Sequence, residues 1–196
     1  LEEFTNIYVY HEYSAYFSFL WTNMRLFLEI SFRNLYYFLT RKAVRQFNRL
    51  VFQYGDSPRY SPRQIKVNGW NLQVPDALSF IYQFREIMVD ESYLFESKNA
   101  NPIIIDCGSN IGLSGIYFAN KFKNASIYCI EADQAIAKTL AENLKNNQAE
   151  KVNVIAKAVW THNEGVQFSS EGSDGGSIGN NSNATLIPSM SLKEFM

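Results

Sequence analysis

The 196-residue sequence predicts an α/β fold: a doubly wound, mainly parallel sheet preceded by a β-hairpin and an N-terminal helical segment. From residue 103 onward, short apolar runs alternate with segments of helical periodicity, in the order IIID, LSGIYFANKF, SIYCIEA, QAIAKTLAENLKNN and VNVIAKAVW. Strands that alternate with helices pair in parallel, because each crossover helix returns the chain to the same edge of the sheet. A glycine turn follows the first run, at the edge where parallel sheets bind ligands.

The first segment, residues 1–56, is expected to be helical and amphipathic. Arg25, Glu29 and Arg33 lie four residues apart, so a helix places them on one face as successive ion pairs. The opposite face is expected to be apolar, with Leu26, Phe27, Ile30, Leu35, Phe38 and Leu39. A basic stretch follows, with Arg41, Lys42, Arg45 and Arg49. We expect the apolar face to pack against the protein or a partner chain, with peripheral contact to an anionic membrane as the alternative.

Residues 57–100 are expected to form a β-hairpin and a helix that leads into the sheet. The stretch GDSPRYSP breaks the preceding helix. The dipeptide Asn68-Gly69 then stands between two runs of alternating apolar residues, which is the strongest short-range signal for a hairpin. Residues 76–89 carry apolar residues at helical spacing. The remaining region, residues 101–196, holds the predicted parallel sheet.

Composition narrows the classes of function. The chain has 18 Lys and Arg against 19 Asp and Glu, so it lacks the basic excess typical of nucleic-acid binding. Cys107 and Cys129 stand in apolar runs without a disulfide pattern, which predicts buried thiols in the cytoplasm. No metal site is expected. The chain begins LEEF without an initiator methionine, which indicates a fragment boundary.

The stretch DCGSNIG predicts a nucleoside-binding site. Asp106 ends a strand expected to be buried, and Gly108 and Gly112 remove side chains where the backbone turns close to a ligand. Asn110 breaks the dinucleotide pattern G-x-G-x-x-G, which argues against NAD. Glu131 ends the next strand, nineteen residues after Gly112, where a carboxylate can accept hydrogen bonds from both ribose hydroxyls.

The sequence resembles the FkbM-type methyltransferases, an S-adenosyl-L-methionine-dependent family with a Rossmann-like fold. The resemblance runs over about residues 63–196, through IKVNGWNLQVPDALSFIYQFREIMVDESYLFES, NPIIIDCGSNIGLSGIYFA, IYCIEAD and VIAKAV. It implies S-adenosyl-L-methionine as the cofactor. The methionine end of the cofactor would be held by Asp106, Gly108, Asn110 and Gly112, and the ribose by Glu131.

Three further site residues follow from the resemblance. Ala158, within IAKAV, would line the adenine pocket. Ser109 and Ser114 would donate to the cofactor carboxylate, with a local helix cap as the alternative role for these serines. The implied reaction is O-methylation of a sugar or other small hydroxylated metabolite, and no catalytic base is identified.

The C-terminal end departs from the family pattern. SLKEFM resembles the helix before the family's next core strand, which normally reads like DLLKIDIEG, so we expect a truncated chain with an incomplete sheet and an open apolar edge. The stretch EGSDGGSIGNNSNAT is expected to be a mobile loop, with an active-site lid as the alternative. Two other functions stay open: an NAD- or nucleotide-binding oxidoreductase domain, and a non-catalytic membrane-docking module.

Overall fold

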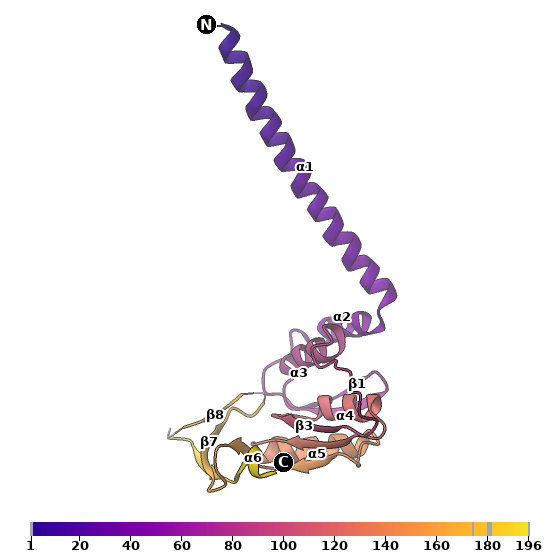
Figure 1. Ribbon diagram of the computed structural model, residues 1–196, viewed down its shortest axis with the longest axis vertical. Helices are drawn as coiled ribbons and strands as arrows, with labels where there is room; N and C mark the ends of the chain where they lie inside the picture. Colours follow the sequence, from indigo (N-terminus) through magenta and orange to yellow (C-terminus); the bar gives the residue numbers. More distant parts are fainter. Residues whose placement is uncertain (1, 174, 180–181, 196) are drawn as a thin grey trace. The chain divides into compact units, whose positions relative to one another are not determined.

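The computed structural model describes the backbone of residues 2–173, 175–179 and 182–195, and side chains from residue 21 onward within those ranges. The chain forms two compact units, Leu1–Arg45 and Gln46–Met196 (Figure 1). The first contains helix α1 (Glu2–Thr40) and the start of helix α2 (Lys42–Tyr54). The second contains the rest of α2 and every strand that the structure describes.

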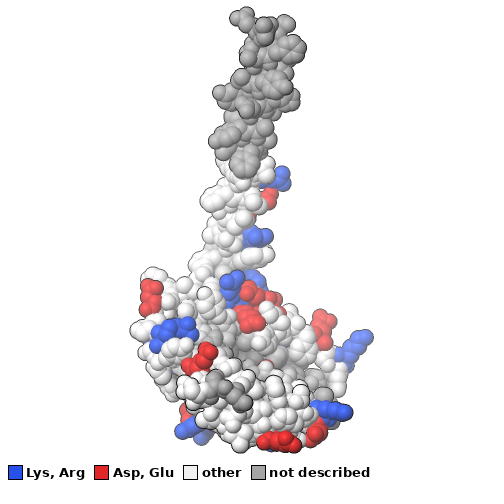
Figure 2. Space-filling model, turned by 90° about the vertical axis from the view of Figure 1, so that its left-hand side faces the viewer, with Lys and Arg blue, Asp and Glu red and all other residues white. Residues whose placement is uncertain are grey.

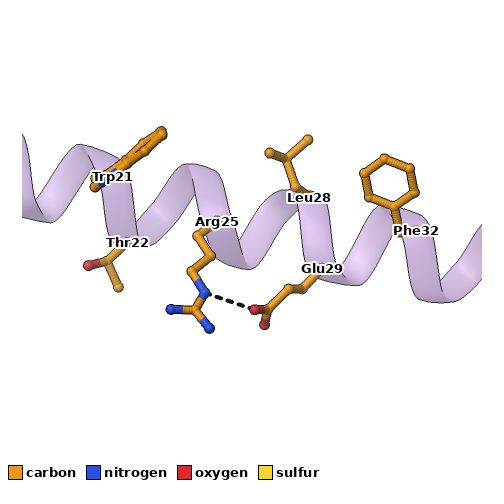
Figure 3. Close-up of a pocket in the computed structure, with 6 residues that line it drawn as sticks. All are labelled: Trp21, Thr22, Arg25, Leu28, Glu29 and Phe32. Carbon is orange, nitrogen blue, oxygen red and sulfur yellow. Dashed lines mark hydrogen bonds and ion pairs between the residues drawn. The ribbon is translucent and has the colours of Figure 1, made fainter.

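Helix α1 carries the first of the two predicted ion pairs, with Arg25 Nε 2.9 Å from Glu29 Oε1. In Figure 3, Trp21, Leu28 and Phe32 project along one edge of the helix, whereas Thr22, Arg25 and Glu29 lie along the other, and the amphipathic character of the whole segment stays a prediction. Within the described ranges, no helix combines the length and apolar content needed to cross a membrane.

The predicted hairpin is present as strands β1 (Arg63–Val67) and β2 (Trp70–Val74), paired antiparallel. Asn68 and Gly69 both have positive φ, 55° and 85°, as a tight two-residue hairpin turn requires. The helix predicted over residues 76–89 consists of α3 (Ala77–Phe84) and a π-helical turn, η1 (Arg85–Val89).

A parallel sheet of three strands follows, in the order β3 (Ile103–Cys107), β4 (Ser126–Ile130) and β5 (Asn153–Ile155). Helices α4 (Leu113–Lys121) and α5 (Gln134–Asn146) connect these strands. This arrangement confirms the predicted α/β class with a parallel sheet. Among the described residues β3 pairs only with β4, and Ile103 is 71% exposed, so this strand is less buried than predicted.

The segment VNVIAKAVW was predicted as one strand, and this is wrong. The chain turns between Ile155 and Ala158, and β6 (Ala158–Trp160) leaves the sheet to pair in parallel with β10 (Ser189–Ser191). Lys157 N–H donates to Ile155 O and Ala158 N–H to Pro188 O, which gives the departing backbone its partners.

The glycine- and serine-rich stretch after Phe168 was predicted as a loop, and this is wrong in part. Strands β8 (Gly176–Ile178) and β9 (Thr185–Ile187) pair antiparallel with β7 (Val166–Ser170) on its two sides. A short helix, α6 (Leu192–Phe195), ends the described chain.

One hydrophobic core joins the hairpin, α3, α4 and α5 to the parallel sheet. Its most deeply buried large side chains come from all of these elements and include Ile65, Leu72, Phe80, Phe84, Ile116, Ile127 and Leu140. Charged side chains of both signs lie in separate small groups on the face of this unit seen in Figure 2. Burial of this apolar surface stabilises the unit and holds the ends of β3 and β4 side by side.

Candidate functional site

A cavity of about 320 Å³ lies at the carboxyl ends of β3 and β4. Four segments line it: the turn after β3, residues 130–133 at the end of β4, residues 157–159 around the start of β6, and parts of β7, of β8 and of their connection. The carboxyl ends of parallel strands are where α/β sheets usually bind ligands. The cavity is therefore the candidate site.

The turn after β3 holds three residues in the left-handed region at alternate positions: Gly108 with φ 80°, Asn110 with φ 46° and Gly112 with φ 88°. A side chain at Gly108 would meet no atom within 4 Å, so this glycine leaves open space at the cavity. A Cβ at Gly112 would lie 3.3 Å from Leu140 Cγ of α5. Gly112 therefore serves helix packing, and it lies outside the cavity lining.

Glu131 links the ends of β3 and β4. Its Oε2 accepts the backbone N–H of Asn110 and its Oε1 accepts the backbone N–H of Asp133, both at 2.9 Å. Burial raises the pKa of Glu131, although these backbone donors act in the opposite direction. Each carboxylate oxygen keeps a further lone pair, so Glu131 can accept hydrogen bonds from a ligand in the cavity that it lines.

Asp106 and its serine neighbours stabilise the turn from within. Ser114 Oγ donates to Asp106 Oδ2 at 2.5 Å, and Ser109 Oγ donates to the Asp106 carbonyl at 2.9 Å. Both serines are buried. Neither they nor Asp106 line the cavity. These bonds to Asp106 account for both hydroxyls, and the alternative role as a helix cap is wrong, because the N-cap of α4 is Gly112 and no side chain caps this helix.

The two cysteines differ in how far they are buried. Cys129 is fully buried, and burial raises its pKa to about 12, so its thiol stays neutral at physiological pH. Cys107 is exposed and lines the cavity, so its predicted burial is wrong. The reason is position, because Cys107 ends β3 at the ligand-facing edge of the sheet.

One wall of the cavity is apolar. Ala158, the first residue of β6, is buried in a small cluster with Val166 and Ile187, and Ala132 and Phe168 pack against this cluster. Ala158, Ala132 and Phe168 also line the cavity. A flat, weakly polar ring system fits such a wall.

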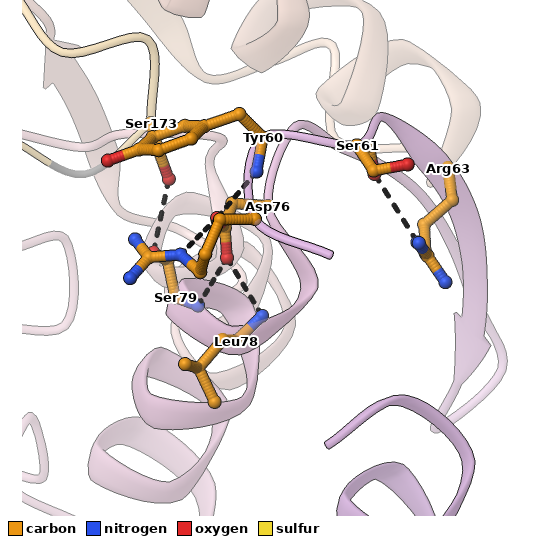
Figure 4. Close-up of polar contacts among 8 residues, drawn as sticks. Tyr60, Ser61, Arg63, Asp76, Leu78, Ser79 and Ser173 are labelled. Carbon is orange, nitrogen blue, oxygen red and sulfur yellow. Dashed lines mark hydrogen bonds and ion pairs between the residues drawn. The ribbon is translucent and has the colours of Figure 1, made fainter. Parts of the chain in front are cut away.

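A buried aspartate joins the segment after α2 to the start of α3 (Figure 4). The Asp76 carboxylate is fully buried and accepts bonds from Arg59 Nε at 2.6 Å and from the backbone N–H groups of Tyr60, Leu78 and Ser79. Burial would raise the pKa of Asp76, but the bonds from Arg59 and the backbone lower it to about 2.

This network reaches the β7–β8 connection. Ser173 Oγ lies 3.1 Å from Ser79 Oγ, at the start of α3, and Ser173 lines the cavity (Figure 4). The connection is thus tied to α3 in the described conformation.

No family model matches the chain. Methyltransferase sdnD from Sordaria araneosa is 37% identical over 70 residues, which are 36% of this chain and 26% of that protein. The chain thus spans about a quarter of the length of this curated relative. The similarity to the FkbM-type methyltransferases stays a prediction.

Two solved structures show a low structural likeness. TYW2 of M. jannaschii, in complex with AdoMet, has 16% identity and a TM-score of 0.35 over 54% of each chain. A SAM-dependent methyltransferase from Agrobacterium tumefaciens has 9% identity and a TM-score of 0.37, over 53% of this chain and 34% of that one. Scores this low carry no argument about the site.

The structure brings four of the seven predicted site residues to the cavity: Gly108, Asn110, Glu131 and Ala158. Asp106, Ser109 and Gly112 lie behind them and support the turn.

Sequence reasoning missed Asp133 and Lys157 as parts of the cavity, whereas the β7–β8 connection lies in the stretch for which an active-site lid was the alternative. Asp133 is the N-cap of α5, and its Oδ1 accepts the N–H groups of Ala135 and Ile136 while the Ser170 hydroxyl donates to its Oδ2. An aspartate just before a helical pattern was the available signal.

Proposed function

We propose that this chain is the cofactor-binding part of an S-adenosyl-L-methionine-dependent methyltransferase. The observation that carries the proposal is Glu131, which the N–H groups of Asn110 and Asp133 hold at the cavity beside a glycine turn. A carboxylate at the end of the second parallel strand is the usual acceptor for ribose hydroxyls. The local similarity to methyltransferase sdnD supports the same class.

The residues around the cavity fit this cofactor. Its volume, about 320 Å³, lies within the range of roughly 300–1,000 Å³ typical of small-molecule pockets. Glu131 would accept the ribose hydroxyls, the open space at Gly108 would admit the methionine end, and the wall formed by Ala158 and Phe168 would receive the adenine.

S-adenosyl-L-methionine supplies an electrophilic methyl group on a sulfonium sulfur. The chain's own residues would contribute binding and orientation of the cofactor, and Ser173 of the β7–β8 connection and Gly176 of β8 line the cavity beside it. The proposed acceptor is a hydroxyl of a sugar or other small metabolite. Transfer of the methyl group to this oxygen would break the carbon–sulfur bond of the cofactor and release S-adenosylhomocysteine, and the proton of the hydroxyl would pass to a base.

Isothermal titration calorimetry with S-adenosylhomocysteine and with NAD tests the proposal. We expect heat of binding with S-adenosylhomocysteine and none with NAD, because Asn110 occupies the turn in place of the dinucleotide glycine pattern. Binding of NAD alone would favour the oxidoreductase alternative and end the methyltransferase proposal.

A second proposal concerns residues 21–55, which we infer make peripheral contact with anionic lipid. Large apolar side chains of α1, among them Trp21, Phe27 and Leu39, are exposed. Between Glu29 and Asp56 the chain carries five cations and no acidic residue. Basic segments next to exposed aromatic residues bind anionic membrane surfaces.

Co-sedimentation with vesicles of phosphatidylserine and phosphatidylcholine tests this contact. We expect pelleting that falls when Lys42 and Arg49 are replaced by glutamine, and that is absent with phosphatidylcholine alone. Equal pelleting of the wild type and the variant would count against an electrostatic contact.

A further inference from the structure

Asn143 of α5 and Asn147, the C-cap residue of this helix, pair with the hairpin as a neighbouring strand would. Asn143 Oδ1 accepts the N–H of Gln73 at 2.7 Å, and its Nδ2 donates to the Gln73 carbonyl at 3.0 Å. One helical turn later, Asn147 makes the same two bonds to Asn71, at 2.7 and 3.0 Å. Alternate residues of an edge strand direct both backbone groups away from their partner strand. The two amides therefore satisfy the outer edge of β2.

The two asparagines differ in one bond. Asn143 Nδ2 also donates to the carbonyl of Ile111, at 2.9 Å, within the glycine turn. The second bond of Asn147 Nδ2 instead goes to the carbonyl of Asn143, in its own helix. Asn143 is fully buried, whereas Asn147 is half-buried. Only Asn143 thus joins the hairpin to the turn that borders the cavity.

The bond from Asn143 to the carbonyl of Ile111 acts on the glycine turn, because Ile111 follows Asn110 in that turn. Its neighbour Asn110 adopts a left-handed conformation, φ 46°, which is uncommon for a residue other than glycine. The N–H of Asn110 is held by Glu131 on one side, and the carbonyl of Ile111 is held by Asn143 on the other. Hydrogen bonds on both sides therefore fix the turn at Asn110.

We infer that Asn143 is a positioning residue for the cofactor: through Ile111 it keeps the glycine turn, and with it the N–H of Asn110, in place on Glu131. The inference rests on the proposed function. Asn147 provides the internal control, because it makes the same pairing with β2 and has no bond to the turn.

The test compares Asn143→Asp with Asn147→Asp. Aspartate keeps the shape and the acceptor that receives the β2 N–H at either position, but it removes the NH₂ donor. Both variants should therefore lose thermal stability, whereas only Asn143→Asp loses the bond to Ile111. We expect the dissociation constant of S-adenosylhomocysteine, measured well below both unfolding temperatures, to rise about tenfold or more for Asn143→Asp. For Asn147→Asp it should stay within about twofold of the wild type.

Hydrogen exchange in the wild type keeps the inference testable if Asn143→Asp does not fold. Addition of S-adenosylhomocysteine should slow exchange of the Gln73 amide, which Asn143 couples to the turn, more than exchange of the Asn71 amide, which Asn147 holds. Equal affinities of the two variants, or equal slowing at Gln73 and Asn71, would overturn the inference and leave the proposed function intact. Absence of binding by the wild type would overturn both.

Discussion

The carboxylate of Glu131 accepts the backbone N–H of Asn110 at 2.9 Å and so joins the ends of two neighbouring parallel strands. This bond places an acidic side chain at the cavity while fixing the turn beside it. Asp133 N–H holds the second carboxylate oxygen. The acid is therefore positioned before any ligand binds, which lowers the entropic cost of recognition.

Replacing Glu131 tests its part in binding. Glu131→Ala should weaken the binding of S-adenosylhomocysteine by about 10- to 100-fold, because a carboxylate bonded to ligand hydroxyls contributes about 1.5–3 kcal/mol. Calorimetry measures the loss. Glu142→Gln, an exposed change on α5, is the matched control and should leave the affinity unchanged. A Glu131→Ala protein that binds like the wild type would place the ribose elsewhere.

The raised pKa of Glu131 predicts opposite effects of pH on binding and on stability. Burial raises this pKa above its ordinary value in the folded protein, so the ionised form, the better acceptor, increases as the pH rises through the raised value. Affinity for S-adenosylhomocysteine should rise over this window. The stability that Glu131 contributes is fully present below its unfolded pKa and is lost as the pH rises through the folded one.

Calorimetry and urea unfolding from about pH 4 to pH 7 would follow both effects. Glu131→Gln has no carboxyl group at this position and should flatten the pH dependence of affinity. A variant that keeps the wild-type profile would assign the titration to another group.

The sequence predicted the chemistry of the cavity better than its walls. Glu131 and the turn from Gly108 to Gly112 were found because strand ends, glycines and acids leave local patterns. The end of β5 at Ile155 was missed, because the apolar run continues through the turn into β6. Strand β8 was missed because it lies within a stretch of glycine, serine and asparagine, which are typical of loops, and β9, at the end of this stretch, has only three residues.

The role of Asn143 had no sequence signal for a different reason. On a helix, an asparagine among charged neighbours is normally a solvated residue, and its burial here depends on the hairpin some seventy residues earlier in the chain. Contacts between segments so distant in sequence are set by tertiary packing, which local spacing does not encode.

Asp76 should stabilise the fold at neutral pH. Its pKa of about 2 lies below the unfolded value, so its contribution is present above the unfolded pKa and is lost as the pH falls toward 2. Asp76→Asn should lower the free energy of unfolding by about 2 kcal/mol at pH 7, as measured by urea denaturation. The variant should also lose less stability than the wild type on acidification.

The exposed pair Arg85 and Asp90, 3.3 Å apart, gives the control for Asp76. Asp90→Asn should change the free energy of unfolding by less than about 1 kcal/mol, because water screens exposed ion pairs. If the two substitutions had equal effects, burial of the Asp76 carboxylate would not be the source of its contribution.

Substitutions of the two turn glycines should differ in whether they reduce mainly ligand affinity or mainly the free energy of unfolding. Gly108→Ala and Gly112→Ala impose the same left-handed strain, which costs about 1–2 kcal/mol. Only at Gly112 does the new methyl lie close to another side chain, 3.3 Å from Leu140. The free energy of unfolding of Gly112→Ala, measured with urea, should therefore fall by about a further 1 kcal/mol. At Gly108 the methyl points into open space at the cavity, and the larger loss there should be in affinity for S-adenosylhomocysteine. Gly112→Val extends the clash with α5 and should unfold the turn. The reverse order, with Gly112→Ala the more stable variant and Gly108→Ala the tighter binder, would show that neither glycine has the role that its surroundings indicate.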